Sequence, residues 1–396
     1  MLRKSIQLIH LLPIYWAVSG LFIINSGDKI LVALIIASIL VKLISCIFDE
    51  NEHISLRDNY MIGVVFICAI YASFSYYHNG YSSSEIRVLI STALYSVISL
   101  PKKIRYKSLI YIITLSSSYI LYQTISIIEI QNLSRMKLPL NAIPYANYTG
   151  LLSIITLYLS YSSNNKQLSI LSILSFIFLS VNVILVDTRG TWLALISSYI
   201  SIIFIIFVRK RSLKLTIISL SLLVSIALLS YPFIENSIER SIKEVELLKE
   251  GNLDSSWGIR VQLWKAGYSI INDTPSMLGL GQTEHLNLIQ KMYREGKLSN
   301  RIAWFDNKNF HNSIIDRTVK YGFLGLMLYI GVILTPFIYG IRNLKSNYSP
   351  LLIIMPIFIF VAGLSYVPLA HPGTYFLYLL TSIFLINKIR HDRTYK

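Results

Sequence analysis

Apolar stretches long enough to cross a membrane recur along nearly the whole chain, and short polar segments separate them. A helix needs about 20 mostly apolar residues to cross the hydrocarbon core of a bilayer. The pattern therefore predicts an all-α polytopic membrane protein with about twelve transmembrane helices. The predicted spans lie near residues 6–25, 30–48, 60–77, 87–100, 108–129, 146–162, 168–187, 191–208, 214–231, 314–340, 348–366 and 373–387.

Composition supports this fold class and removes others. Of the 396 residues, 54% are hydrophobic and 14% are charged, whereas soluble domains carry roughly 25% charged residues. The net charge of +16 does not indicate nucleic-acid binding, because the cations lie mostly in short loops between apolar runs. Cys46 and Cys68 fall in or near predicted spans, so no disulfide framework can be read. The first apolar run lacks a small-residue cleavage site, and we expect an uncleaved first span.

The basic clusters predict the orientation of the chain. With twelve spans, they all fall on one side of the membrane, together with the amino terminus. The clusters are residues 101–107, 209–214, 342–345 and 388–396. By the positive-inside rule that side is the cytoplasm, and both termini are expected there.

One large polar segment, residues 232–312, is expected on the opposite face. This divides the single membrane domain into residues 1–231 with nine spans, the external loop, and residues 313–396 with three spans. Short helices are expected in the loop, with a tight turn at residues 279–282. The first has an apolar stripe and is expected to lie on the membrane or on the bundle. The stripe consists of Ile238, Ile242, Val245 and Leu248.

Three features of the expected external face are candidates for chemistry. The first is a turn between the seventh and eighth spans, where Asp187 and Arg189 lie at the membrane edge before Gly190. Ionisable groups at such a depth are costly and often functional. The alternative is that Asp187 and Arg189 pair with each other and cap the two helices.

The second feature is Arg260, which lies four residues before Trp264 and therefore on the same face of a predicted loop helix. A guanidinium beside an aromatic ring can bind phosphate with its planar set of donors. The alternative is an ordinary amphipathic loop helix.

The third feature is the polar start of the tenth span, in the stretch NFHNSIIDRTVKYGFLG. His311 lies just before the expected helix, and histidine exchanges protons near neutral pH. Asn312 is expected only to cap the helix. Asp316, Arg317 and Lys320 follow on the first turns and are further candidates for lining the same cleft.

Arginines with a base, and no metal-ligand spacing, favour an anionic phosphate substrate. The chain has no phosphate-binding loop of the GxxxxGK[ST] type, so nucleoside triphosphate hydrolysis is not expected. A membrane enzyme whose active side faces away from ATP must use a substrate that is already activated, for which a sugar linked to a lipid diphosphate is the obvious choice. We expect no cofactor and no metal.

The segment HNSIIDRTVKYGFLG resembles the pattern H[NSQ]-x9-G-x-x-G of the bacterial O-antigen ligases, at His311, Asn312, Gly322 and Gly325. The twelve-span layout with a late external loop is also similar to that family, which lies in one superfamily with the O-antigen polymerases. TRGTWLAL and IRVQLWKAG look like two further family segments that contain an arginine.

The resemblance implies a glycosyltransferase of the GT-C type in the bacterial inner membrane, with its active face in the periplasm. The donor would be undecaprenyl-diphosphate-linked polysaccharide, and the acceptor a sugar hydroxyl of lipid A–core. By the same resemblance, Arg189 and Arg260 would bind the diphosphate and His311 would deprotonate the acceptor. Transfer would invert the sugar configuration without metal or ATP.

Two other functions remain open at this point. An O-antigen polymerase would use the same donor, and Arg240 with Gly251 fits one copy of a polymerase-type R-x10-G motif, although chance alone would give about one such match. A flippase for lipid-linked oligosaccharides would instead predict cations deep within spans and a repeat between the two halves.

Overall fold

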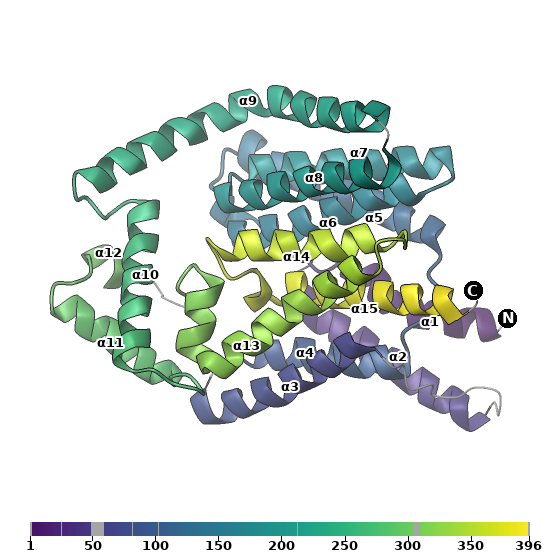
Figure 1. The fold of residues 1–396 in the computed structure, drawn as a ribbon, viewed down its shortest axis with the longest axis horizontal. Helices are drawn as coiled ribbons and strands as arrows, with labels where there is room; N and C mark the ends of the chain where they lie inside the picture. The colour runs from purple at the N-terminus through teal and green to yellow at the C-terminus, as the bar shows by residue number, and fades with distance from the viewer. Residues whose placement is uncertain are drawn as a thin grey trace.

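The computed structural model describes residues 2–24, 26–48, 59–80, 82–101, 103–211, 213–303 and 309–394, and the regular structure within these ranges is helical (Figure 1). The first eight α-helices are α1 (Leu2–Ala17), α2 (Gly27–Phe48), α3 (Tyr60–Asn79), α4 (Ser83–Ile98), α5 (Tyr106–Ile125), α6 (Ala142–Ser162), α7 (Lys166–Leu185) and α8 (Arg189–Lys210). The others are α9 (Leu213–Lys249), α10 (Ser256–Asp273), α11 (Gln282–Arg294), α12 (Asn300–Ala303), α13 (Ser313–Arg342), α14 (Ser349–Gly363) and α15 (Pro372–Thr394). Short turns η1 (Ser126–Ile130), η2 (Arg135–Lys137) and η3 (Pro368–Ala370) lie in the connections.

Among the described residues, six helices are long and apolar enough to cross a membrane, which confirms a polytopic helical membrane protein. They are Gly27–Phe48, Tyr60–Asn79, Tyr106–Ile130, Lys166–Leu185, Arg189–Arg209 and Ser313–Arg342. The other six predicted spans also fall on helices, but these are shorter, less apolar or only partly described. The number twelve therefore stays a prediction.

Helix α6 lies inside the bundle and is buried along nearly its whole length. Its polar side chains bond to neighbouring helices. The Tyr148 hydroxyl donates to the Ala17 carbonyl oxygen at 2.8 Å, and Thr191 Oγ1 donates to Asn147 Oδ1 at 2.8 Å. A bilayer core offers no hydrogen-bond partners, so polar groups there need partners within the protein. A buried α6 can therefore be more polar than a helix that faces lipid.

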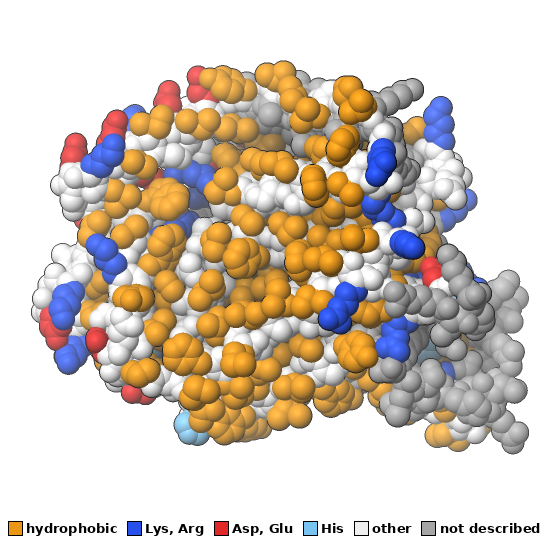
Figure 2. Space-filling view, in the orientation of Figure 1, with side chains coloured by type: hydrophobic (Ala, Val, Ile, Leu, Met, Phe, Trp, Pro, Cys, Tyr) orange, Lys and Arg blue, Asp and Glu red, His pale blue; other side chains and the backbone are white. Residues whose placement is uncertain are grey.

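The two ends of the bundle differ in charge. Both chain ends lie at one end, and α10, α11 and α12 lie at the other (Figure 1). On the face in Figure 2, cations predominate at the end with the termini, whereas acidic and basic side chains mix at the opposite end. A broad hydrophobic band covers the surface between them. This agrees with the predicted gathering of the basic clusters on one side, within the described residues.

The expected break near residue 231 does not occur, because α9 runs without interruption from Leu213 to Lys249. The stretch expected to start the loop has helical spacing and good helix formers, so the helix continues past the boundary expected between the ninth span and the loop. Three residues of the predicted stripe, Ile238, Ile242 and Val245, are 47%, 55% and 44% exposed. The stripe therefore does not pack on the bundle, and contact with the membrane remains the prediction.

The predicted second loop helix is present as α10, and with α11 and α12 it forms a small outer unit with its own apolar core. This core also takes in a residue from the first turns of α13. Its buried members are Ile259, Leu263, Ala266, Ile270, Leu280, Ile289, Leu298, Ile302, Phe310 and Val319. The shared core fixes α10 against the start of α13, which matters for the site described below.

Helix α13 is kinked at Gly322, where φ is 67° and ψ is −176°, and the predicted turn at Gly279 packs into the break. Leu280 N donates to the Val319 carbonyl oxygen at 2.9 Å, just before the kink. After the kink, two amides of α13, those of residues 323 and 324, donate to the carbonyl oxygens of residues 276 and 277 at 3.2 and 3.1 Å. A side chain at Gly279 would overlap the backbone of α13, and one at Gly322 would overlap the backbone of the turn that contains Gly279. The first glycine of the sequence pattern thus has a structural role.

Candidate active site

The start of α13 is organised by Asn312, as predicted. Its side-chain oxygen accepts hydrogen bonds from Ile314 N at 2.9 Å and Ile315 N at 3.2 Å, which are amides that a helix start leaves unpaired. His311 precedes this cap in a left-handed conformation with φ of 51°. Its amide donates to Asn309 Oδ1 at 3.1 Å, and its carbonyl oxygen accepts from Trp264 Nε1 at 3.4 Å. Helix α10 therefore contacts the histidine directly.

The other polar residues at the start of α13 are buried in ion pairs. Lys320 Nζ lies 2.8 Å from Asp316 Oδ1, which also accepts from Phe310 N at 3.0 Å. Arg317 Nη1 lies 2.6 Å from Glu85 Oε1 on α4. The exposed fractions of the Asp316, Arg317 and Lys320 residues are 3%, 5% and 7%. The Arg317–Glu85 pair holds the first turns of α13 to α4, whereas the Lys320–Asp316 pair neutralises two charges within α13. The role of the three residues in lining a cleft stays a prediction.

Arg189 begins α8, but its partner is not Asp187. Its Nη1 lies 3.3 Å from Glu244 Oε2, and its Nε donates to Ser237 Oγ at 3.2 Å; both partners are on α9. The Asp187 carboxylate instead pairs with Arg240 of α9 at 2.6 Å. The mutual pairing considered from sequence is therefore absent, and both residues tie the start of α8 to the outer part of α9.

Arg260 lies on α10, and its guanidinium faces Trp257, with 6.0 Å between Cζ and the ring centroid. Its aromatic neighbour is thus not Trp264, which contacts His311. Arg260 Nη1 donates to Ser256 Oγ at 3.1 Å. Its Nε is shielded from solvent and has no hydrogen-bond partner among the described residues. Such a donor is suited to an anionic ligand.

Electrostatic interactions connect the three predicted residues. Burial lowers the pKa of Arg260, the Glu244 carboxylate opposes this, and the charge of Arg189 lowers the pKa further. Burial also lowers the pKa of His311 to about 4, and the charge of Arg260 acts in the same direction. Arg260 thus interacts electrostatically with both Arg189 and His311, and the lowered pKa favours a neutral His311 near pH 7.

Two further arginines lie in this cluster and were not predicted as site residues. Arg135, in the connection between α5 and α6, donates to the carbonyl oxygens of Val186 and Asp187, and its charge also acts on Arg260. Arg240 holds the Asp187 carboxylate from α9. The predicted topology places both arginines on the external side of the membrane, and this position could have identified them as candidates for the site.

Comparison with known proteins agrees with the sequence pattern. Residues 174–330 match the family model described as O-antigen ligase. An uncharacterized protein of Haemophilus influenzae is 25% identical over 199 residues, which is 49% of this chain and 49% of that protein. The chain therefore spans about half the length of the relative that it matches. The matched region holds Arg189, Arg260 and His311, and it supports the resemblance: residues 174–330 are similar to the O-antigen ligase family.

Proposed function

We propose that this protein is an O-antigen ligase of the GT-C type. It would transfer undecaprenyl-diphosphate-linked O-polysaccharide to a sugar hydroxyl of lipid A–core during lipopolysaccharide biosynthesis. The observation that carries the proposal is the convergence of two arginines and a neutral histidine within the region that matches the family model. A ligase needs these elements: cations for a diphosphate and a base for a hydroxyl.

In this proposal, Arg189 and Arg260 bind the donor diphosphate. Arginine can neutralise a leaving diphosphate through charge-assisted, bidentate hydrogen bonds. The Nε of Arg260 has no hydrogen-bond partner among the described residues, so it can donate to a phosphate without breaking an existing bond. Arg189 is held by Glu244 and Ser237, which orient its guanidinium before the donor arrives. Its bond to the phosphate then competes with the Glu244 pair.

His311 acts as the general base in this mechanism. Its ring takes the proton of the acceptor hydroxyl, the hydroxyl oxygen attacks the anomeric carbon from the face opposite the diphosphate, and the bond to the diphosphate breaks. The sugar configuration inverts, and undecaprenyl diphosphate leaves. In the free protein, burial and Arg260 keep the ring neutral. A bound diphosphate neutralises Arg260 and raises the pKa of His311, which strengthens the base when the donor is present.

The reaction takes place at the periplasmic face of the inner membrane, with both termini in the cytoplasm. Residues 232–312 form the periplasmic loop, and residues 1–231 and 313–396 hold the nine and three spans on either side. Because α9 continues past residue 231, its outer part projects from the membrane and carries Ser237, Arg240 and Glu244 into the site.

A gene deletion, complemented with variants, tests the proposal. The surface lipopolysaccharide and the carrier-linked glycans are then separated on gels. We expect the deletion to leave lipid A–core without O-antigen and long chains on the lipid carrier. His311→Ala should fail to complement, although it is inserted at the normal level. His78→Ala, which changes an exposed histidine at the end of α3, is the matched control and should complement.

The same gel identifies the alternatives. Core that carries one repeat unit would mean an O-antigen polymerase, and the acceptor of the proposed reaction would be wrong. Carrier-linked glycan that accumulates only on the cytoplasmic side would mean a flippase. Full activity of His311→Ala would refute the role of the histidine.

A further inference from the structure

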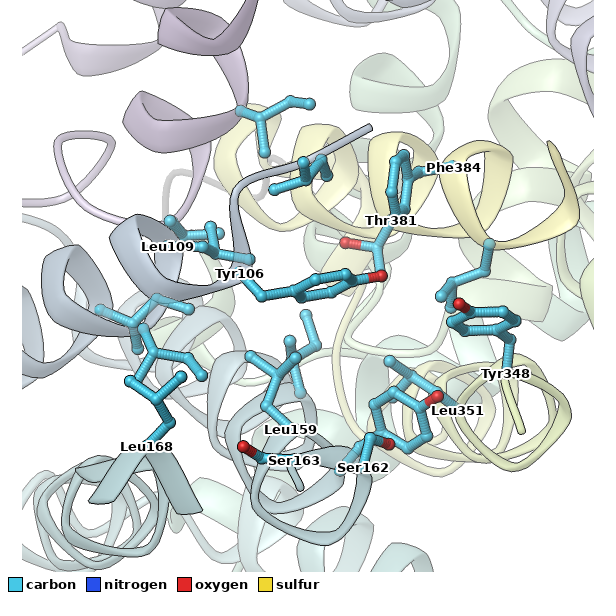
Figure 3. Close-up of a pocket in the computed structure, with 18 of the residues that line it drawn as sticks. Tyr106, Leu109, Leu159, Ser162, Ser163, Leu168, Tyr348, Leu351, Thr381 and Phe384 are labelled. Atoms are coloured by element: carbon cyan, nitrogen blue, oxygen red, sulfur yellow. The ribbon is translucent and has the colours of Figure 1, made fainter. Parts of the chain in front are cut away.

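A cavity of about 430 Å³ lies at the end of the bundle that carries the chain termini, away from the candidate active site. Residues of α1, α5, α6, α7, α14 and α15 and of the connections near them line it, and Figure 3 shows several of their side chains. Its interior is apolar, with side chains such as Ile14, Ile113 and Leu377. Its rim is polar, and Asn165 and Asn347 there are exposed. The volume is in the usual range for a ligand pocket, and an amphipathic ligand fits this division.

The rim is also basic. The lining residues Ile104 and Tyr106 alternate along the chain with three exposed cations, Lys103, Arg105 and Lys107. Lys166 follows the rim residue Asn165, and Lys345 lies two residues before Asn347. The acid Asp392 interacts electrostatically with Tyr106, so it offsets one of these cations. Several cations therefore surround the polar end of an apolar cavity.

Arg209, at the end of α8, adds a cation close to the cavity. Its Nη2 donates to the Lys345 carbonyl oxygen at 3.3 Å, and its charge acts on the hydroxyl of the lining residue Tyr158. Its Nη1 is shielded from solvent and has no hydrogen-bond partner among the described residues. A shielded guanidinium donor beside a basic rim points to an anion, as in the case of Arg260 above.

We propose that this cavity binds an anionic phospholipid from the adjacent leaflet, with one acyl chain between α1, α5 and α15 and the phosphate at the basic rim. The apolar interior takes the chain, because filling such a space restores the contacts that its lining residues otherwise lose. The rim cations attract an anionic headgroup, as juxtamembrane basic residues do. The site is separate from the proposed transfer reaction and does not depend on it.

Photo-crosslinking of the unchanged protein tests the location. The purified protein is placed in bilayers that contain a trace of phosphatidylglycerol with a diazirine on its acyl chain, and labelled peptides are mapped by mass spectrometry. We expect labels on cavity residues of α1, α5, α6 and α15, and at least fivefold fewer with the matching phosphatidylcholine probe. Labels spread evenly over the lipid-facing helices would overturn the proposal. Displacement by a polyprenyl phosphate at far lower concentration than by phosphatidylglycerol would overturn the choice of phospholipid.

Two pairs of variants test the two halves of the site. Thr381→Phe places a ring in the cavity (Figure 3), and Ser118→Phe places the same ring on the exposed side of α5 as the control. We expect Thr381→Phe to lose cavity labelling while Ser118→Phe retains it. Lys107→Gln should reduce the preference for phosphatidylglycerol, whereas Lys291→Gln on α11 should not. Equal labelling within either pair contradicts that half of the proposal, and the mapping above remains decisive if a variant does not fold.

Discussion

Replacing Gly322 by alanine tests the most unusual local feature of this fold. The backbone there has φ of 67° and ψ of −176°, a region that is essentially restricted to glycine and costs other residues about 1–3 kcal/mol. A methyl group would also overlap the Met277 carbonyl oxygen and the Gly279 amide, so the docked segment would have to move.

The magnitude follows from what this movement breaks. The two hydrogen bonds from α13 to residues 276 and 277 have a net value of about 1 kcal/mol each. Together with the backbone strain, the loss in folding free energy should be about 3–5 kcal/mol. The segment between α10 and α11 would also separate from α13, close to the buried core that positions His311.

Gly331→Ala is the matched control on the same helix. No atom lies within 4 Å of its added methyl group, and its backbone is helical, so alanine should stabilise α13 by up to about 1 kcal/mol. The assay is unfolding of the purified proteins in detergent at one fixed heating rate, since membrane proteins often unfold irreversibly. We expect a midpoint several degrees lower for Gly322→Ala, with faster proteolysis between residues 274 and 281. Equal midpoints for the two variants would refute the docking argument.

Three other predictions follow from the charges. Burial lowers the pKa of His311 most, and Arg260 is one of two cations that lower it further. Arg260→Met should therefore move the acid limb of the pH profile for sugar transfer to higher pH, and an unchanged limb would contradict their coupling. Glu85→Gln leaves Arg317 buried without its carboxylate and should cost about 3–5 kcal/mol, seen as a far larger drop in melting temperature than for the exposed control Glu295→Gln. The pKa of His311 is about 4 in the folded protein, whereas its ordinary value is 6.5. As the pH falls, the unfolded chain therefore binds the proton first. The free energy of unfolding should fall by up to about 3 kcal/mol between pH 6.5 and pH 4. His311→Gln should show a smaller fall in acid-unfolding titrations.

The sequence predicted the helices and their sides better than it predicted the partners of single residues. The apolar runs located the six helices that, among the described residues, are long and apolar enough to cross a membrane, because burial in lipid requires whole spans of apolar residues. The same alternation of sides predicts Arg189, Arg260 and His311 at one end, and in the structure the charge of Arg189 acts on Arg260 and that of Arg260 on His311. Spacing did not identify Trp257 as the ring beside Arg260. Trp257 and Trp264 both lie within reach of Arg260 on one face of the helix, and side-chain packing decides which ring it contacts. Nor does spacing reveal the Arg317–Glu85 pair, which joins residues far apart in the chain.

The charged residues at the start of α13 are paired within the protein, and their expected role in lining the site stays a prediction. Asp316 neutralises Lys320, and Glu85 neutralises Arg317, so these residues add no net charge to the site. The excess charge lies instead where α8, α9, α10 and the α5–α6 connection meet.

Among the described residues of that cluster, four arginines face two carboxylates, which leaves two positive charges. The arginines are Arg135, Arg189, Arg240 and Arg260, and the carboxylates are Asp187 and Glu244. A diphosphate diester carries two negative charges, so a bound donor would make the cluster neutral. Since an uncompensated charge in a partly buried site is costly, this balance favours a diphosphate over a neutral sugar. Replacing Glu244 by glutamine would raise the excess to three, and we expect tighter donor binding with slower release of undecaprenyl diphosphate.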